Sequence, residues 1–599
     1  MIPVPPVWVF DTECYVDYFL IALKNVYSGE VEAYEFYPGI EPDYERIKTS
    51  LTTKQLISFN GINYDIPLLR LFFANNDNAT LKKASDAIII ENMRPWELET
   101  MYGGADFHPD HIDLIEVAPG MVGLKLYGGR MHSQRLQDLP IEPSANITLA
   151  DRIALKDYCI NDLNTTIDMY RQLKPQIDLR VAMSAKYGID LRSKSDAQIA
   201  EAVIRQEVQN KVGRKVYRPD ISPDYSFKYH VPDFVSFNAP GLNQVLEIIR
   251  NATFTINEKG SVELPQIFES LRIRIGAGTY TMGIGGLHSN EQCNSHITNS
   301  GLFLKDRDVT SYYPSIILNQ SLFPAHMGEA FLEVYQGIVT QRIEAKRIGD
   351  KVTDAAMKIM INGSFGKFGS KWSVLYSPDL LIQTTVTGQL ALLMLIESVE
   401  LAGLTVVSAN TDGIVIKGDA SKVDDLNAII AYWEMITGFN TEETEYRALY
   451  SKDVNNYIAI KPSGDVKLKG LYAPAGMQKN VTNSICVEAV IEYLKSGIPL
   501  ANTIMGCIDI RKFITIRQVN GGAKYDDQYL GKAVRWYYRK GETRSIRYAA
   551  NNNKVARSDG AFPLMELPAV LPQDIDYDWY VKEAQSILND VGYDQYLSN

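Results

Sequence analysis

The sequence predicts a multidomain protein of mixed α/β and α+β class, and three observations lead to this prediction. The chain has 599 residues, which is enough for about three or four domains of ordinary size. Short apolar runs that hold acidic residues near their ends, such as Asp11 and Asp308, are typical of strands. Other stretches repeat apolar residues at helical spacing, so we expect helices as well as sheets.

The composition excludes several classes of protein. A hydrophobic content of 46% favours packed cores over disorder. No apolar run approaches the ~18 residues that predict a membrane span, and residues 1–13 lack the basic flank of a signal peptide. The five cysteines form no CxxC pair, which favours a reduced compartment and argues against zinc or iron–sulfur sites. We therefore expect a cytoplasmic protein without a membrane partner.

The charge distribution leaves two interpretations open. The net charge of −12 is unlike that of a nucleic-acid-binding protein, but a local groove depends on the distribution of charge. Residues 524–557 contain nine basic residues, three acids and six aromatic residues. Basic side chains can neutralise phosphates while aromatic faces stack on bases. A solvated basic face would produce the same pattern.

Acidic residues in the N-terminal third form the first candidate site. Asp11 and Glu13 stand at i and i+2 of a predicted strand, so their side chains share one face. Asp65 opens a predicted helix, and Tyr158 and Asp162 stand one turn apart in another. Single D-x-E triplets are usually surface acids. Together, four carboxylates can hold two Mg²⁺ ions ~3.5–4 Å apart, with the tyrosine orienting the attacking water.

The segments that contain these residues are FDTE, NGINYD and YCIND. Their order and spacing over roughly residues 1–185 resemble the three motifs of DEDDy proofreading 3′–5′ exonucleases. The resemblance implies an exonuclease domain with an RNase H-like fold.

The segment KDRDVTSYYPSIILN predicts a strand with Asp308, followed by a turn and a helix that begins near Pro314. It resembles motif A of family B DNA polymerases, DxxSLYPSI, with Tyr312 in place of the usual leucine. The resemblance makes Asp308 a metal ligand. It makes Tyr313 the ring beneath the incoming sugar, where its bulk excludes a 2′-hydroxyl. A plain core turn is the alternative.

Two predicted helices, joined by a break at residues 349–353, place basic residues on a shared face. Arg342 and Lys346 stand at i and i+4 in the first helix, and Lys358 and Asn362 in the second. Like charges at this spacing destabilise a helix unless an anion is present. A triphosphate would supply that anion, and its developing charge would be stabilised during transfer. A solvated basic face is again the alternative.

The second of these helices resembles motif B, Kx3NSxYG, with Lys358 and Asn362 at the matching positions. Gly363 replaces the usual serine and Phe365 the usual tyrosine. The resemblance implies that Phe365 stacks beside the nascent base pair. The interval between motifs A and B is short, whereas protein-primed phage polymerases have a long insertion there.

The segment VVSANTDGIVIK, residues 406–417, predicts a β-hairpin because two β-branched runs flank a polar tip. It resembles motif C, YGDTDS, in which Asp412 keeps the second acid and Asn410 replaces the first. The resemblance implies that Asp308 and Asp412 together hold two Mg²⁺ ions. Two carboxylates and three phosphates offer enough hard oxygen ligands for Mg²⁺, so we expect an active site rather than a silenced one.

Two further segments resemble elements of the same family. A glycine cluster at residues 283–286 resembles the Y-x-G-G element that links the exonuclease and polymerase modules. The K-x-Y element, which contacts primer and template, would fall at Asn455 and Tyr457, so the tyrosine is kept and the lysine is not. Nearby lysines that would compensate are Lys452, Lys467 and Lys469.

The motifs together resemble a compact, phage-like family B DNA polymerase, with a right-hand palm, fingers and thumb after the exonuclease domain. The implied parts are an exonuclease domain at 1–185, a connecting region at 186–300, a palm at 300–320 and 375–460, fingers at 321–374 and a thumb with the C-terminal DNA-binding region at 461–599. Because the first motif starts at residue 10, we expect no room for the extra N-terminal domain of larger relatives. The residues expected to contact DNA are Tyr457, Lys532, Arg535 and Arg539.

The resemblance implies the addition of deoxynucleotides to a primer 3′-hydroxyl by two-metal phosphoryl transfer, with proofreading. The implied cofactor is Mg²⁺, two ions per active site, and Mn²⁺ is expected to substitute. The implied partners are primer–template DNA and deoxynucleoside triphosphates, and we expect a monomer that replicates a phage genome in the host cytoplasm. Two alternatives stay open. One is an exonuclease or DNA-binding factor with a silenced polymerase site; the other is a primer-independent initiating polymerase.

Overall fold

The computed structural model describes residues 5–593, which form two compact units. The first unit comprises residues 5–195, 475–485 and 504–580, and the second comprises 196–474, 486–503 and 581–593. Both units combine helices with β-sheets. The multidomain mixed α/β class expected from the sequence is therefore confirmed. The segment expected to form the thumb is divided between the two units.

The first unit contains a five-stranded sheet with the order β3-β2-β1-β4-β5. Strands β1, β2 and β3 are antiparallel, whereas β4 and β5 run parallel to β1. The strands are β1 (Val7–Cys14), β2 (Phe19–Asn25), β3 (Val31–Phe36), β4 (Gln55–Ser58) and β5 (His111–Asp113). The helices of this part are α1 (Tyr44–Thr52), α2 (Asp65–Phe73), α3 (Asn78–Ile89), α4 (Pro95–Tyr102), α5 (Leu124–Arg130) and α6 (Leu149–Tyr187).

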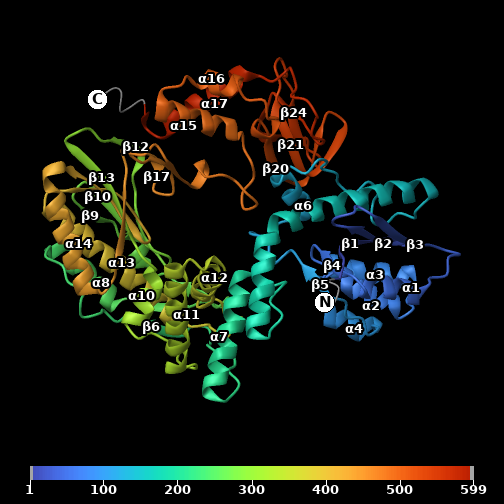
Figure 1. Ribbon diagram of the computed structural model, residues 1–599, viewed down its shortest axis with the longest axis horizontal. Coiled ribbons are helices and arrows are strands. Elements are labelled where there is room, and N and C mark those ends of the chain that lie inside the picture. The colour runs from blue at the N-terminus through green and yellow to red at the C-terminus, as the bar shows by residue number, and fades with distance from the viewer. Residues whose placement is uncertain (1–4, 594–599) are drawn as a thin grey trace. The chain divides into compact units, whose positions relative to one another are not determined.

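The two faces of β1 belong to different hydrophobic cores. Trp8 and Phe10 pack with apolar residues of α2 and α3, whereas Val7 and Val9 pack with those of α6. Figure 1 shows α6 on one side of the sheet and α1 to α4 on the other. Because side chains alternate along a strand, Asp11 and Glu13 continue the face of Val7 and Val9, and they therefore point toward α6.

A second sheet of the first unit comes from the C-terminal part of the chain, with the order β23-β22-β20-β21-β24. It packs closely on α5, because a Cβ atom added at Gly129 would lie 2.9 Å from Cγ2 of Ile516 in β20. The strands are β20 (Thr515–Tyr525), β21 (Gln528–Tyr538), β22 (Ser545–Tyr548), β23 (Lys554–Asp559) and β24 (Ala561–Pro563).

The second unit contains a seven-stranded antiparallel sheet with the order β16-β13-β15-β14-β11-β10-β9. Its strands are β9 (Ile273–Ile275), β10 (Gly278–Met282), β11 (Leu287–Ser289), β13 (Leu302–Val309), β14 (Thr405–Asn410), β15 (Gly413–Asp419) and β16 (Thr441–Glu445). The first three strands come from the expected connecting region, and they extend the sheet that contains Asp308.

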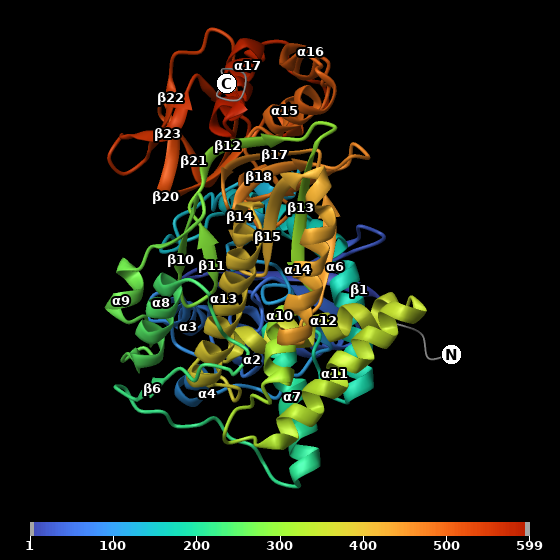
Figure 2. The same cartoon turned by 90° about the vertical axis from the view of Figure 1, so that its left-hand side faces the viewer.

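Helices cover one face of this sheet and a second sheet covers the other. Figure 2 shows α13 and α14 across the helical face. The helices that pack on this face are α10 (Tyr312–Asn319), α13 (Pro378–Leu401) and α14 (Val423–Thr437). On the opposite face, Leu304 and Val415 pack against Leu449 and Ala459 of the sheet β12-β17-β18-β19. Its strands are β12 (Gln292–Ile297), β17 (Ala448–Asp453), β18 (Asn456–Ile460) and β19 (Val466–Lys469).

By length and composition, α13 is the one helix of the described chain that is apolar enough to cross a membrane. The structure buries 83% of its apolar window inside the second unit. Core residues of the seven-stranded sheet pack around α13. It is therefore a core helix in this structure.

Two antiparallel helices, α11 (Glu329–Ile348) and α12 (Lys351–Lys367), follow α10. The break between them is shorter than expected, because α12 already begins after Asp350, whose side chain accepts a hydrogen bond from the Thr353 N–H. Helix α12 packs closely on α7 (Asp196–Val212). A Cβ atom at Gly363 would lie 2.6 Å from the carbonyl oxygen of Asp196, so the close packing of the two helices favours glycine at this position.

The remaining elements lie outside the candidate sites. The strands are β6 (Ser226–Lys228), β7 (Thr253–Ile256) and β8 (Val262–Glu263), which form a three-stranded sheet. The helices are α8 (Pro240–Asn251), α9 (Gln266–Ser270), α15 (Ser484–Ser496), α16 (Leu500–Met505) and α17 (Tyr577–Asp590), together with short 3₁₀ turns at Ala420–Lys422, Gly470–Tyr472 and Ile510–Lys512.

Candidate active sites

The structure brings the four predicted acids of the first unit into one cluster. Asp11 and Glu13 come from β1, Asp65 begins α2, and Asp162 lies in α6. Oδ1 of Asp65 accepts hydrogen bonds from the backbone N–H and the hydroxyl of Thr12, at 3.0 and 2.5 Å. These bonds fix the start of α2 against the strand that carries Asp11 and Glu13.

Burial and mutual repulsion raise the carboxyl pKa values of this cluster. For Asp11, burial is the largest cause, and repulsion from Asp65, Glu13 and Asp162 adds to it. Burial, with Asp162 next, raises the pKa of Glu13 to about 8, and burial raises that of Asp65 to about 7. Divalent cations would favour the ionised carboxylates. The cluster therefore has the electrostatic properties of a cation site.

The donor atoms of the cluster fit a hard cation. One donor atom each of Asp11, Glu13 and Cys159 lies within 4.8 Å of the others. Burial and the nearby carboxylates raise the pKa of the Cys159 thiol well above its usual value, so the sulfur stays protonated and is a poor ligand. The effective donors are carboxylate oxygens, which Mg²⁺ prefers.

A lysine that the sequence did not single out, Lys125 of α5, also reaches this cluster. Its ammonium group donates a hydrogen bond to Oδ1 of Asp162 and lies 4.1 Å from the centre of the Tyr158 ring. Burial raises the pKa of Asp162, and Lys125 partly offsets that rise. The pKa of the buried Tyr158 is also raised, by burial and by the carboxylates. Its phenol therefore keeps the proton and can donate a hydrogen bond.

The predicted hairpin of the second unit is confirmed, and it places Asp412 beside Asp308. Strands β14 and β15 are joined by Thr411 and Asp412. Asp308 lies opposite Gly413, and the N–H of Val309 donates to the carbonyl oxygen of Asp412 at 2.7 Å. A Cβ atom at Gly413 would lie 2.3 Å from Oδ1 of Asp308. A side chain at position 413 would therefore displace the carboxylate of Asp308.

A cavity of about 340 Å³ opens on Asp308 and Asp412, with Arg342, Lys346 and Asn362 on its wall. The basic pair has one acid beside it, because Oδ1 of Asp354 lies 3.2 Å from Nε of Arg342. The two basic residues still face the cavity.

Lys358 is the lysine of the segment that resembles motif B. It does not line the cavity of about 340 Å³. It is exposed on α12, one turn before Asn362. Its expected contact with nucleotide therefore stays a prediction, since the long side chain would have to swing toward the cavity.

The aromatic residues of the expected nucleotide site stack on one another. The rings of Tyr313 and Phe365 lie 4.2 Å apart with an interplanar angle of 19°. The Tyr313 hydroxyl donates to the carbonyl oxygen of Gly285. A Cβ atom at Gly286 would lie 2.8 Å from Oγ1 of Thr411. The glycine cluster at 283–286 thus contacts both the expected sugar-facing tyrosine and the tip of the hairpin.

A second cavity, of about 290 Å³, also reaches Asp308 and Asp412. The hydroxyl of Thr411 donates to Oδ1 of Asn410, at 3.1 Å. The polar residues that line this cavity beside the two acids include Asp306, Asn410, Tyr457, Lys467 and Lys469. Sequence reasoning missed Asp306, which stands two residues before Asp308 on the same strand.

The expected DNA contact of Arg535 is wrong. Its side chain is fully buried in the first unit. The guanidinium group donates to four backbone carbonyl oxygens, those of Ser133, Gln134, Leu564 and Met565. Arg535 therefore joins two segments of the first unit, and a phosphate has no access to it.

The other basic and aromatic residues of 524–557 differ in exposure. Lys532 is exposed on β21 and stays available for a phosphate. Arg539 forms an ion pair with Glu542 and lies 3.6 Å from the centre of the Phe562 ring. The aromatic residues expected to stack on bases are mostly core residues instead. The buried ones are Tyr525, Trp536, Tyr537 and Tyr538.

No family model matches the sequence. Over 132 residues, or 22% of the chain, it is 35% identical to DNA polymerase 1 of Aeropyrum pernix, of which the match covers 14%. It is 26% identical over 132 residues to DNA polymerase 1 of Saccharolobus solfataricus, covering 21% of this chain and 14% of that protein. The matches thus span about a seventh of these relatives. The solved family B DNA polymerase of Pyrobaculum calidifontis aligns with 98% of this chain and 78% of its own, at 13% identity and a TM-score of 0.40.

Proposed function

We propose that the protein is a template-directed DNA polymerase of family B, of the compact bacteriophage type, with a proofreading 3′–5′ exonuclease. It adds deoxynucleotides to a primer 3′-hydroxyl and replicates a phage genome. One observation supports this most: Asp308 and Asp412 lie side by side at a cavity whose wall carries Arg342 and Lys346. The partial matches to proteins named DNA polymerase 1 support the same conclusion.

In the polymerase reaction, Asp308 and Asp412 would hold two Mg²⁺ ions with their carboxylate oxygens. When bound, the ions would lower the pKa of the attacking hydroxyl and neutralise charge on the triphosphate. Arg342 and Lys346 would bind the triphosphate from the cavity wall and stabilise the charge that develops on the leaving group. The ring of Tyr313 would bound the sugar pocket, where its bulk opposes a 2′-hydroxyl.

In the exonuclease reaction, the cluster of the first unit would bind the frayed 3′ end. Asp11, Glu13, Asp65 and Asp162 are the carboxylates that would hold the ions there. The Tyr158 phenol, which stays protonated, would orient the attacking water by a hydrogen bond. Mispaired ends reach such a site more readily because they unpair at lower cost.

Extension of a 5′-labelled primer on a longer template tests the proposal. With Mg²⁺ and deoxynucleotides, we expect full extension; without deoxynucleotides, we expect shortening from the 3′ end. Shortening in both conditions would mean that Asn410 has silenced the polymerase site, and the function would reduce to that of an exonuclease. Product formation without a primer would instead indicate an initiating enzyme.

A further inference from the structure

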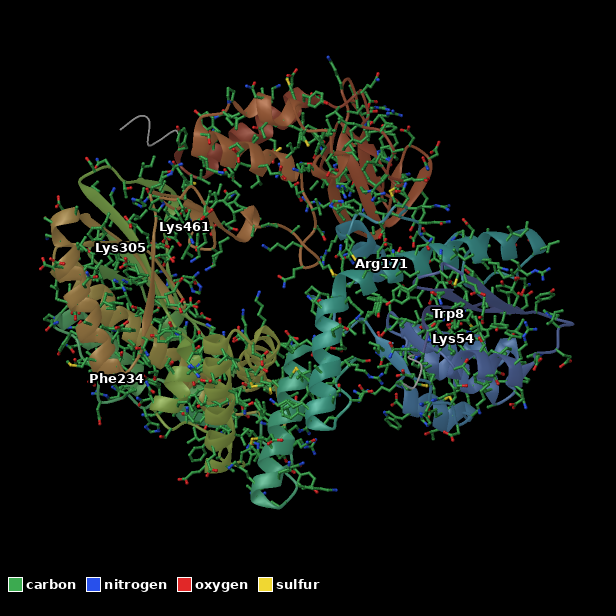
Figure 3. The ribbon with its side chains drawn as sticks, viewed as in Figure 1. Trp8, Lys54, Arg171, Phe234, Lys305 and Lys461 are labelled. Carbon is green, nitrogen blue, oxygen red and sulfur yellow. The ribbon has the colours of Figure 1, made fainter. Side chains whose placement is uncertain are left out.

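Strand β13 separates basic from acidic side chains. Lys305 and Arg307 both form ion pairs with Glu443, and Figure 3 labels Lys305 on this strand. Asp306 and Asp308 alternate with them and therefore point to the opposite face, where both line the cavity of about 290 Å³. The catalytic acid of the proposed polymerase thus has a second acid beside it on the same face.

Asp306 is a buried acid that contacts two polar side chains, those of Tyr446 and Lys467. Its side chain is buried, and its Oδ2 atom accepts a hydrogen bond from the Tyr446 hydroxyl at 2.5 Å. The same oxygen lies 3.0 Å from Nζ of Lys467, a residue of β19. A buried carboxylate needs such partners, since an unpaired charge in the interior is strongly unfavourable.

Lys467 also reaches the candidate metal ligand. Its Nζ atom lies 3.2 Å from Oδ2 of Asp308, and 37% of its side chain is exposed. Cations that occupy the Asp308 oxygens would compete with this contact, whereas the contact with Asp306 would persist. The ammonium group would then present its free donors to the cavity.

The other two lysines considered as replacements for the K-x-Y lysine are placed differently. Lys452 forms an ion pair with Asp590 at 2.6 Å. Lys469 lies with its Nζ atom 5.8 Å from the centre of the Tyr457 ring. Of the three, Lys467 alone contacts both carboxylates of β13.

We propose that Lys467 binds the 3′-terminal phosphodiester of the primer, supplying from β19 the cation that is absent at Asn455, and that Asp306 and Tyr446 are the positioning residues that hold it. This role rests on the proposed polymerase function. It differs from that of a purely structural ion pair, because a structural pair would have no effect on the affinity for DNA.

Steady-state extension in an Asp11→Ala background, where the primer is not digested, tests the role of Lys467. We expect Lys467→Ala to raise KM for primer–template about tenfold, the loss of one charge-assisted contact. The KM for the deoxynucleotide should change less than about twofold, and Lys467→Arg should recover most of the loss because the charge is kept. The matched control is Lys461→Ala, which removes a lysine that directly follows β18 (Figure 3).

The positioning role of Asp306 is tested by a double-mutant cycle. Asp306→Asn should raise KM for primer–template in the same direction, and the double variant with Lys467→Ala should be no worse than Lys467→Ala alone. Additive losses would overturn the positioning role of Asp306. Equal losses for Lys467→Arg and Lys467→Ala, with a lower melting temperature and unchanged DNA affinity, would overturn the primer-binding role.

Equilibrium binding separates this inference from the proposed function. The affinity for primer–template is measured by fluorescence anisotropy over a range of salt concentrations, which requires no turnover. Lys467→Ala should make the negative slope of log K against log salt shallower by about one if it removes one phosphate contact. A parent protein that fails to extend primers but shows this change would refute the polymerase function and keep the contact. A parent that extends primers and shows no change would refute the contact alone.

Discussion

The two acidic sites of the protein differ in how they accommodate like charges. In the first unit, Asp65 and Asp162 are buried, and Lys125 is a cation that directly contacts the cluster. In the second unit, the Asp308 side chain is 46% exposed. Basic side chains from two elements surround that second pair: Arg342 and Lys346 of α11, and Lys467 of β19.

Because of this difference, we expect a divalent cation to have a different role at each site. Burial makes ionised carboxylates costly, so the first site should need cations to reach a stable ionised state. The second site is open to solvent and supplied with protein cations, so it should need Mg²⁺ for reaction but not for folding. Variants of matched chemistry in the two units can test this contrast.

The largest expected effect is a complete separation of the two activities. Asp412→Ala should lower primer extension by about 10³-fold or more, since a metal ligand contributes several kcal/mol to the transition state. It should leave digestion of the primer unchanged. Asp11→Ala should have the reverse effect for the same reason.

Each variant is the control for the other, and both activities are read from one labelled primer. Loss of both activities by either variant, with an unchanged melting temperature, would contradict the existence of separate sites.

How far the sequence predicts these sites depends on how local the determining contacts are. The alternation along β1 correctly places Asp11 and Glu13 on one face, and the pattern around Asp412 correctly predicts a hairpin. These features depend on neighbouring residues. The contact of Lys125 with Asp162 joins residues 37 positions apart, and nothing in the local pattern signals it.

The failed prediction for Arg535, and the strand order that the sequence did not predict, have the same explanation. Arg535 follows a run that resembles a basic surface, but segments 133–134 and 564–565 cover it. Strands β9 to β11 join the sheet of Asp308 through a pairing between His288 and Asn410. Strand order and burial by distant segments are tertiary properties, so a local pattern does not reveal them.

The next largest effect concerns a glycine at each site. In Gly413→Ala, the new methyl group would meet Oδ1 of Asp308 at 2.3 Å and displace it. We expect extension to fall about 10–100-fold, because small displacements of a reacting group are costly. In Gly61→Ala, the new methyl group would meet Oγ of Ser58 at 2.1 Å. Digestion should fall less, since that hydroxyl is the end of a side chain that can rotate.

The matched control is Gly241→Ala, where a Cβ atom would have no neighbour within 4 Å. It should leave both activities within about twofold. Initial rates of extension and of nucleotide release measure the series. An unimpaired Gly413→Ala variant would show that Asp308 does not have to stay at its observed position.

A smaller effect is expected for Lys125. Lys125→Met keeps the length of the side chain and removes its charge, so Asp162 loses a charge-assisted hydrogen bond. We expect digestion to fall about tenfold, with extension unchanged, when single-nucleotide release is measured at saturating Mg²⁺.

The control for Lys125→Met is Lys174→Met, which removes an exposed ion pair with Asp178 elsewhere on α6. Faster digestion by Lys125→Met would mean that the lysine competes with the cation, and the contrast between the two sites would then need revision.

The smallest effect is on stability, and its pH dependence is opposite in sign to that of an acid paired with a basic residue. The carboxyl pKa values of Asp11, Glu13 and Asp65 are raised in the folded protein. Between pH ~4 and ~8 the folded state therefore binds more protons than the unfolded state, so stability falls as the pH rises in this window. In the presence of a chelator at pH 8, Asp11→Asn should raise the free energy of unfolding, because it removes a charge that burial and the neighbouring acids disfavour.

The comparison variant is Asp308→Asn, which should have little effect on stability because its ion pair with Lys467 is partly exposed, with 46% of the Asp308 side chain accessible to solvent. Addition of Mg²⁺ should stabilise the parent and remove the advantage of Asp11→Asn, because a ligand that binds only the folded state stabilises it. Melting curves at pH 5 and pH 8, with and without Mg²⁺, measure all four conditions. Asp11→Asn could instead destabilise the protein at pH 8 in the presence of chelator. That result would show that repulsion among the buried acids does not destabilise the folded state, and burial would not explain why the two sites differ.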